Sequence, residues 1–373
     1  MTRYGSWFVV LTLIVSSIAL GAEKNAVQTL NIGDPAPGFN LPGVDGRNYS
    51  LQDFNDAKIL VVIFTCNHCP TAQAYEDRIK KLVSDYKDKG VAFVAISPND
   101  PGAVRLDELG YTDLGDSFED MKIRAKDREF NFPYLYDGET QEVSRAYGPT
   151  ATPHVFVFDA KRKLCYVGRI DDSERENRVK TQDTRDALNA LCAGKAVPVE
   201  RTKAFGCSIK WANKRESVKE SLQRWAAEEV SLELITRGSL QELIKNDSDK
   251  LRLVNVWATW CGPCIVEFPE LVKINRMYRH RAFELITVSA DDPDEREEVL
   301  SFLKKQEASC KNYLFGSTDK YMLVEAVDKE WSAALPYTIL IRPGGQILYR
   351  HEGMIDPLEL RRLIVKNLAS DRR

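Results

Sequence analysis

The sequence predicts an α/β protein made of two tandem copies of one fold. First, 373 residues are too many for a single hydrophobic core of ordinary size. Second, a Cys-x-x-Cys pair occurs twice, at 66–69 and at 261–264. Third, each pair directly follows a short, continuous apolar run of strand length and opens a helical pattern, and the elements around the two pairs recur in the same order.

The composition is that of a soluble globular protein, with 43% hydrophobic and 29% charged residues. The net charge of -3 gives no reason to expect nucleic acid as a partner. Eight cysteines are too few for a scaffold held together by disulfides. Because four of them form the two pairs, the cysteines indicate redox or metal chemistry.

Residues 1–22 are predicted to be a signal peptide. Arg3 supplies a basic start, an apolar run covers 7–20, and the small residues Gly21 and Ala22 follow. The run is shorter than the roughly 20 residues of a membrane-spanning helix, which favours cleavage. We therefore expect an extracytoplasmic protein, periplasmic or secreted, in a compartment where disulfides persist. The alternative is an N-terminal membrane anchor.

The first unit is predicted to cover residues 31–192. A turn-rich entry is followed by a strand, a helix and a second strand, and this order implies a parallel crossover. A later pair of strands forms a hairpin, so the sheet is mixed. The predicted strands are 59–64, 91–97, 155–159 and 163–169, and the predicted helices are 70–89, 117–129, 139–147 and 181–192.

The second unit is predicted to cover residues 231–373, after a linker at 193–230 that contains a short helix. Its elements repeat the order of the first unit. The predicted strands are 251–257, 283–289, 312–315, 338–341 and 346–350, and the predicted helices are 239–245, 265–278, 293–305, 320–327 and 357–369.

A cysteine at the start of a helix is suited to thiol chemistry. Unpaired backbone N–H groups and the helix dipole stabilise its thiolate, and the second cysteine, one turn along, can close a disulfide. The alternative for the second pair is half of a zinc site. No further Cys-x-x-Cys or His-x-x-His lies at zinc-finger spacing, so we favour redox use and expect no metal or cofactor.

The residues around the second pair resemble a known family. W-A-T-W-C-G-P-C at 257–264, followed by E-F-P at 267–269, resembles the TlpA/ResA-type extracytoplasmic thiol–disulfide oxidoreductases of the thioredoxin superfamily. The entry G-D-P-A-P-G-F at 33–39 resembles the AhpC/TSA–redoxin branch of that superfamily. Together they imply two tandem thioredoxin-like folds, each a three-layer α/β/α arrangement with a mixed sheet.

The resemblance also implies roles at the second site. Cys261 would be the nucleophile that forms the mixed disulfide, and Cys264 the cysteine that resolves it. Leu335 and Pro336 align with the cis-proline loop that presents backbone to the substrate peptide. Trp260, directly before the first cysteine, is expected to contact substrate.

Two positions distinguish this site from cytosolic thioredoxin. A buried aspartate normally stands six residues before the first cysteine, where this chain has Asn255, which cannot accept a proton. Glu267 lies three residues after Cys264, on the same helical face, and is the carboxylate that the TlpA/ResA type offers instead. We predict that Glu267 is the acid/base partner. The alternative is a solvent-facing glutamate on an amphipathic helix.

At the first site, Cys66 and Cys69 enclose Asn-His instead of Gly-Pro. We predict that His68 stabilises the Cys66 thiolate, lowers its pKa and makes this disulfide the more oxidising of the two. Thr152 and Pro153, directly before a strand, align with the cis-proline loop. The alternative is a structural disulfide or a degenerate copy.

The remaining cysteines have no motif. Cys165 is predicted to be a core thiol, and Cys310 to be inert. Cys192 and Cys207 could form a structural bridge, or Cys207 could act as a third thiol that receives electrons from Cys66.

We therefore expect an exported thiol–disulfide oxidoreductase that acts on exported proteins with cysteines or disulfides, and possible exchange with a membrane electron donor. One alternative is a non-catalytic adaptor that binds peptides and keeps relic redox sites. The other is a thiol-dependent antioxidant peroxidase. The sequence does not support a peroxidase, because peroxiredoxins have the pattern P-x-x-x-T-x-x-C and this chain has Ile63 at the position of the threonine, three residues before Cys66.

Overall fold

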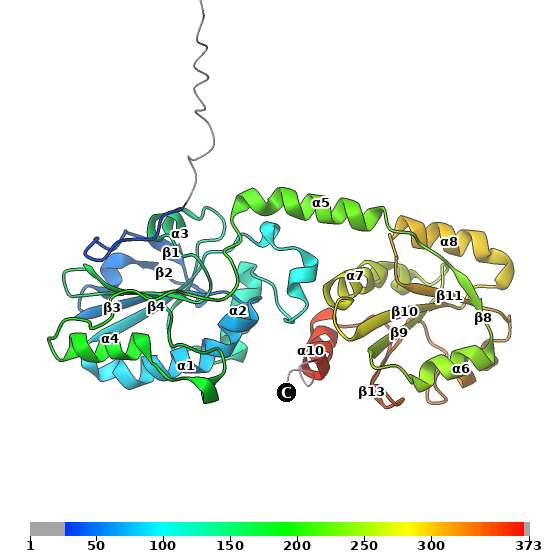
Figure 1. The fold of residues 1–373 in the computed structure, drawn as a ribbon. Helices are drawn as coiled ribbons and strands as arrows, with labels where there is room; N and C mark the ends of the chain where they lie inside the picture. The colour runs from blue at the N-terminus through cyan, green and yellow to red at the C-terminus, as the bar shows by residue number, and fades with distance from the viewer. Residues whose placement is uncertain (1–26, 369–373) are drawn as a thin grey trace, which may run out of the picture.

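The computed structural model describes residues 27–368. The predicted signal peptide, 1–22, lies outside the described residues. Two α/β units lie side by side and are joined by helix α5 (Arg215–Ala226) (Figure 1). The predicted fold class, two tandem thioredoxin-like folds, is confirmed. From residue 27 to residue 368, no helix combines the length and apolar character needed to cross a membrane.

The first unit contains a mixed five-stranded sheet in the order β5-β4-β3-β6-β7, with a small β1–β2 hairpin packed against it. β3 is parallel to β4 and antiparallel to β6. The strands are β1 (Asn40–Pro42), β2 (Asn48–Ser50), β3 (Ile59–Phe64), β4 (Val91–Ser97), β5 (Tyr134–Tyr136), β6 (His154–Phe158) and β7 (Leu164–Gly168). The helices are α1 (Pro70–Tyr86), α2 (Phe118–Asp127), α3 (Glu142–Tyr147) and α4 (Asp183–Cys192).

The central strand β3 shows why its sequence is an uninterrupted apolar run. Alternate side chains point to opposite faces of a strand, and both faces of β3 are covered. Ile59, Val61 and Ile63 join the core beneath α1 and α4. The side chains between them join the core beneath the hairpin and α3. The result is the predicted three-layer arrangement, which holds the end of β3 and the cysteines after it in place.

The second unit has a six-stranded sheet in the order β13-β12-β9-β10-β11-β8. Its strands are β8 (Glu233–Ile235), β9 (Leu251–Trp257), β10 (Phe283–Ser289), β11 (Lys311–Phe315), β12 (Tyr337–Ile341) and β13 (Ile347–Glu352). Its helices are α6 (Arg237–Lys245), α7 (Gly262–Tyr278), α8 (Arg296–Lys305), α9 (Lys320–Val327) and α10 (Pro357–Leu368). The edge strand β8 was not predicted, because three residues are too short to show a pattern.

The first part of the connecting segment, expected to be a linker, packs on the first unit. Arg201 forms a parallel bridge to Val167 on β7, and Cys207 forms an antiparallel bridge to Thr152 just before β6. The predicted short helix is α5, and it follows these contacts. The chain from 193 to 211 therefore extends the first unit before it leaves for the second.

The two units share a hydrophobic cluster. Val104 and Leu109, from the loop after β4, belong to the same buried cluster as Met277 and Tyr278 at the end of α7. The Tyr278 hydroxyl donates a hydrogen bond of 2.8 Å to the carbonyl oxygen of Thr112. The interface thus joins a loop of the first unit to the C-terminal end of the helix that begins at the second cysteine pair.

Candidate active sites

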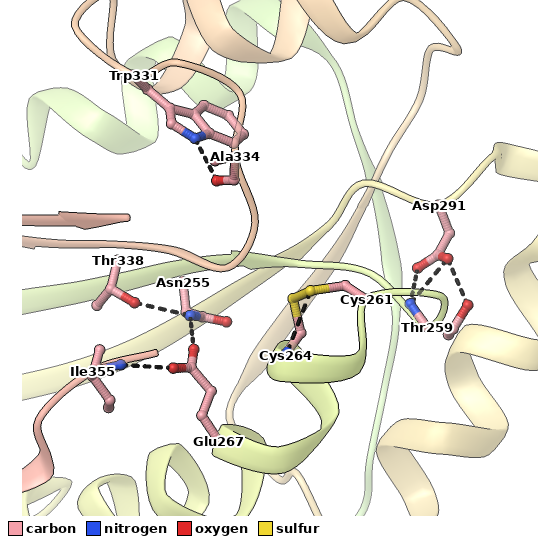
Figure 2. The surroundings of a disulfide bond; sticks show 10 residues. All are labelled: Asn255, Thr259, Cys261, Cys264, Glu267, Asp291, Trp331, Ala334, Thr338 and Ile355. Atoms are coloured by element: carbon pink, nitrogen blue, oxygen red, sulfur yellow. Dashed lines mark hydrogen bonds between the residues drawn. A yellow bond between two sulfur atoms is a disulfide. The ribbon is translucent and has the colours of Figure 1, made fainter. Parts of the chain in front are cut away.

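The second site is a disulfide at the start of a helix, as predicted. Cys261 and Cys264 are joined, with their Cα atoms 5.2 Å apart. Cys261 caps the N-terminus of α7, and its sulfur accepts the backbone N–H of Cys264 at 3.3 Å (Figure 2). The buried strand β9 delivers this cap, and the helix dipole favours a thiolate there once the disulfide is reduced.

The predicted proline loop lies at the same end of the sheet. Leu335 and Pro336 are joined by a cis peptide bond directly before β12. β12 pairs antiparallel with β9, so this loop meets the end of β9 from which Cys261 follows. The indole N–H of Trp331 donates to the carbonyl oxygen of Ala334 at 2.8 Å and fixes the loop (Figure 2).

The loop before Cys261 is anchored by Asp291, which the sequence analysis missed. Its carboxylate accepts the Thr259 backbone N–H at 3.1 Å and the Thr259 hydroxyl at 2.6 Å. Next to this anchored residue, Trp260 is 65% exposed. A signal did exist, since Asp291 follows β10, whose carboxyl end lies beside that of β9.

Glu267 is buried, which excludes the solvent-facing alternative. It is 4% exposed and accepts hydrogen bonds from the Asn255 side-chain amide at 2.9 Å and from the Ile355 backbone N–H at 3.0 Å. Figure 2 shows this pair on the Cys264 side of the disulfide. Burial raises the pKa of Glu267, although both hydrogen bonds oppose the rise. The other side-chain atom of the amide, Asn255 Oδ1, has no hydrogen-bond partner among residues 27–368.

The first site holds free thiols, and here the second cysteine of the pair, not the first, caps the helix. Cys69 caps α1, and its sulfur accepts the Ala72 backbone N–H at 3.4 Å. Thr152 touches both thiols, since its hydroxyl lies 3.2 Å from the Cys66 sulfur and its carbonyl oxygen 3.3 Å from the Cys69 sulfur. The bond from Thr152 to Pro153 is cis. The predicted proline loop and both cysteines therefore come together.

The ring of His68 is held by Asp116, a residue that the sequence analysis did not identify. Its ring Nδ1 lies 2.5 Å from the Asp116 carboxylate, which also accepts the backbone N–H groups of Asn67 and His68 and the side-chain amide of Asn99. Burial alone would lower the pKa of His68, but Asp116 outweighs it and raises that pKa. Potential metal-binding atoms of Cys66, His68 and Asp116 lie within 4.8 Å of one another. Four hydrogen bonds to one carboxylate explain this cluster as an anchor for the cysteine loop.

The prediction that His68 lowers the pKa of Cys66 is wrong. Burial raises the pKa of the Cys66 thiol, and the neighbouring Cys69 and Asp116 raise it further. Burial also opposes a thiolate at Cys69, but hydrogen bonds from Cys207, Cys66 and the Ala72 N–H outweigh it and place the pKa of Cys69 far below its usual range. The charge on Cys69 in turn helps to raise the pKa of His68. The surroundings of this site therefore favour a thiolate at Cys69 more than at Cys66.

The remaining cysteines fall into two groups. Cys192 is exposed and Cys207 is half-buried, and both are free thiols, so the possible bridge between them is not formed. Cys207 instead lies beside the first site, where its backbone N–H donates to the Cys69 sulfur at 3.3 Å. Burial raises the pKa of Cys310 to about 12, as expected for an inert thiol, and Cys165 is half-buried.

Two buried cysteine pairs at helix starts, each reached by a proline loop, define a thioredoxin-fold protein with two potential redox sites. The Redoxin family model matches residues 31–188 and again residues 226–361, which together make up most of the chain. The chain belongs to the Redoxin family.

Curated relatives are similar over parts of their length. The thiol-disulfide oxidoreductase ResA of Halalkalibacterium halodurans is 32% identical over 27% of this chain and 52% of its own. ResA of Bacillus cereus is 24% identical over 42% of this chain and 83% of its own. The chain spans about half the length of the first curated relatives that it matches.

Among solved structures, an uncharacterized conserved protein from Geobacillus kaustophilus is 40% identical over 48% of this chain and 92% of its own, with a TM-score of 0.44. A hypothetical protein from Sinorhizobium meliloti 1021 is 34% identical over 50% of this chain and 97% of its own, again with a TM-score of 0.44.

Proposed function

We propose that this protein is an exported thiol–disulfide oxidoreductase that exchanges disulfides with cysteines of extracytoplasmic proteins through both Cys-x-x-Cys sites. The disulfide between Cys261 and Cys264 is the main observation in support, because it lies at a helix start, beside the exposed Trp260. The family membership and the similarity to ResA agree with it. A membrane electron donor would supply the reducing equivalents.

In the reducing direction, the Cys261 thiolate attacks a disulfide of the substrate protein. One sulfur–sulfur bond forms, the substrate disulfide breaks, and one substrate thiolate leaves and takes up a proton. The Cys264 thiol then loses its proton and attacks the sulfur of Cys261. This step restores the disulfide of the enzyme and releases the second substrate thiol.

Glu267 is the proposed acceptor of the Cys264 proton. It is a buried carboxylate with a raised pKa, so it can hold a proton more readily than an exposed glutamate. Asn255 supports both protonation states. Its N–H₂ group donates to the carboxylate, and its unpartnered Oδ1 can accept a hydrogen bond from the carboxylic acid when the amide turns over.

Insulin reduction by the full mature chain tests the activity. We expect Cys261→Ser to lower the rate by about a hundredfold or more, because it removes the attacking thiolate. Cys66→Ser should retain second-site activity, and Cys310→Ser is the matched control at an inert thiol. If neither active-site substitution changes the rate, the enzyme proposal fails and the peptide-binding adaptor is favoured. Peroxide consumption that depends on Cys66 would instead indicate a peroxidase.

Export is tested by expressing the full chain in a bacterial host with two membranes. We expect a periplasmic protein whose N-terminus begins after Gly21 or Ala22, and Leu13→Arg should block its export. An uncleaved chain in the membrane fraction would contradict cleavage and indicate an anchor.

A further inference from the structure

Cys207 reaches the first site through backbone contacts. The Thr152 N–H donates to the Cys207 carbonyl oxygen at 3.0 Å, and the Cys207 N–H donates to the Cys69 sulfur at 3.3 Å. Gly206 makes this approach possible. Its φ is +140°, and a Cβ there would lie 2.0 Å from the Thr152 carbonyl oxygen.

The segment that carries Cys207 is fixed from its other end as well. The Lys210 backbone N–H donates to Asn99 at 2.9 Å, and the Lys210 carbonyl accepts the Asp100 N–H at 3.0 Å. The ammonium group of Lys210 pairs with Glu108 at 2.5 Å. Because side-chain and backbone contacts hold both sides of Cys207, its position beside the thiols is part of the fold.

The three thiols differ in their access to solvent. Cys66 and Cys69 are 3% and 0% exposed, whereas Cys207 is half-buried. The Cys207 side chain also packs against the buried cluster of Cys66, Cys69 and Ala72. Cys69 is therefore the sulfur that both other cysteines adjoin, and Cys207 is the thiol through which a second protein can most easily reach it.

We propose that Cys207 is a third redox-active cysteine of the first site, and that Cys69 forms a disulfide alternately with Cys66 and with Cys207. This inference rests on the proposed function, because it requires that the first site undergoes thiol–disulfide exchange. It makes Cys207 the point at which a partner dithiol protein reduces the site.

The exchange balances within the chain. Starting from the Cys66–Cys69 disulfide, the Cys207 thiolate attacks the sulfur of Cys69. The Cys69–Cys207 bond forms as the Cys66–Cys69 bond breaks, and Cys66 leaves as a thiolate that takes up the proton released by Cys207. No electron enters or leaves. The oxidised position moves to the more exposed cysteine, and Cys66 is free for the next substrate.

Disulfide mapping of the full mature chain tests this inference. We expect Cys66→Ser, titrated with oxidised glutathione, to form a Cys69–Cys207 disulfide, detected by mass spectrometry of non-reduced peptides. Cys66→Ser/Cys207→Ser should lose it, and Cys66→Ser/Cys192→Ser should keep it as the control for the exposed thiol. In the unsubstituted chain, partial oxidation should give both the Cys66–Cys69 and the Cys69–Cys207 linkages.

Two results would overturn the inference alone. One is a folded Cys66→Ser protein in which Cys69 stays a free thiol or carries only glutathione. The other is an unsubstituted chain that forms only the Cys66–Cys69 linkage at every oxidant concentration. If the unsubstituted chain forms neither linkage, the exchange activity proposed for the first site fails together with the inference.

Discussion

At the scale of single residues, each cysteine loop is held by a carboxylate from another part of its unit. Asp116 accepts backbone N–H groups inside the first pair, and Asp291 accepts one just before the second. Only Asp291 could have been found from the sequence, because it follows a strand beside the one that delivers the cysteine. Asp116 stands in an irregular loop with no pattern that relates it to Cys66. Its contact depends on how that loop folds back.

Asp116→Asn should make the first site less oxidising. Without the carboxylate, burial lowers the pKa of His68, and the ring loses the positive charge that is attracted to a thiolate at Cys69. A less stable reduced form lowers the reduction potential, by about 30 mV for a tenfold change in the equilibrium constant. Glutathione equilibration of the first-site disulfide measures this. Asp291→Asn should leave it unchanged, and a higher potential in Asp116→Asn would contradict the argument.

Glu267 was the residue best predicted from spacing, while its partner was not. Because Glu267 lies three residues after Cys264, the spacing correctly predicted its face of α7. The sequence showed that Asn255 replaces an aspartate, but not that it bonds directly to Glu267. That contact joins a strand to a helix, and its geometry is set by packing between layers.

Glu267→Gln should abolish two opposite pH dependences, one of activity and one of stability. Because burial raises the pKa of Glu267 above 4.5, its contribution to the free energy of unfolding is fully present below pH 4.5 and is lost as the pH rises through the raised pKa. Resolution of the mixed disulfide needs the carboxylate, so its rate should rise over the same range. In the variant both slopes should disappear, and resolution at neutral pH should slow by about tenfold or more. Stopped-flow kinetics and urea unfolding at several pH values test this, and a variant that keeps both slopes would exclude Glu267.

At the scale of elements, the sequence predicted the central strands well and the edges poorly. β9 and β10 match their predicted bounds, because both are buried on each face and are apolar along most of their length. The three-residue edge strand β8 has no such pattern. Helix α8 begins at Arg296, later than predicted, because 293–295 form a 3₁₀ turn. Short and exposed elements depend on their neighbours, which a local pattern does not show.

Helix α7 is held to its sheet by an aromatic cluster. Phe268 is fully buried, with ring centroids 4.9 Å from Trp257 and 5.1 Å from Phe302. Phe268→Ala should lower the free energy of unfolding by about 3–5 kcal/mol, since it leaves a cavity among three rings. Val266→Ala, on the exposed face of the same helix, is the matched control and should cost about 0.5 kcal/mol or less. Chemical denaturation measures both, and equal losses would contradict this packing.

At the scale of the whole molecule, the two units are packed together as well as joined. Gly110 lies so close to α7 that a Cβ there would be 2.8 Å from the carbonyl oxygen of Met277. Arg281 lies with its guanidinium 4.1 Å from the centre of the Tyr111 ring and donates a hydrogen bond to the Gly110 carbonyl. The sequence predicted two tandem units but not this interface, because its residues belong to an irregular loop and a helix end.

The shared cluster should make the two units unfold together. Leu109→Asp places a charge among the buried apolar side chains between them, at a cost of about 3 kcal/mol. We expect calorimetry to show one transition for the unsubstituted chain and two for this variant. Val199→Asp, at a half-exposed position of the connecting segment, should keep the single transition. Two transitions in the unsubstituted chain would show that the units are energetically independent.

The bridge between Cys207 and Thr152 has a practical consequence for any attempt to separate the halves. A fragment cut after α4, at residue 192, would lack Cys207 and Lys210. It would expose the edge of β7 that Arg201 covers and leave the Thr152 N–H without its acceptor. The reduction potential measured on this fragment would then be that of a first site without these contacts. A fragment intended to behave like the native first half should run from residue 27 through Lys214, whose ammonium group bonds to the carbonyl oxygen of Ile209.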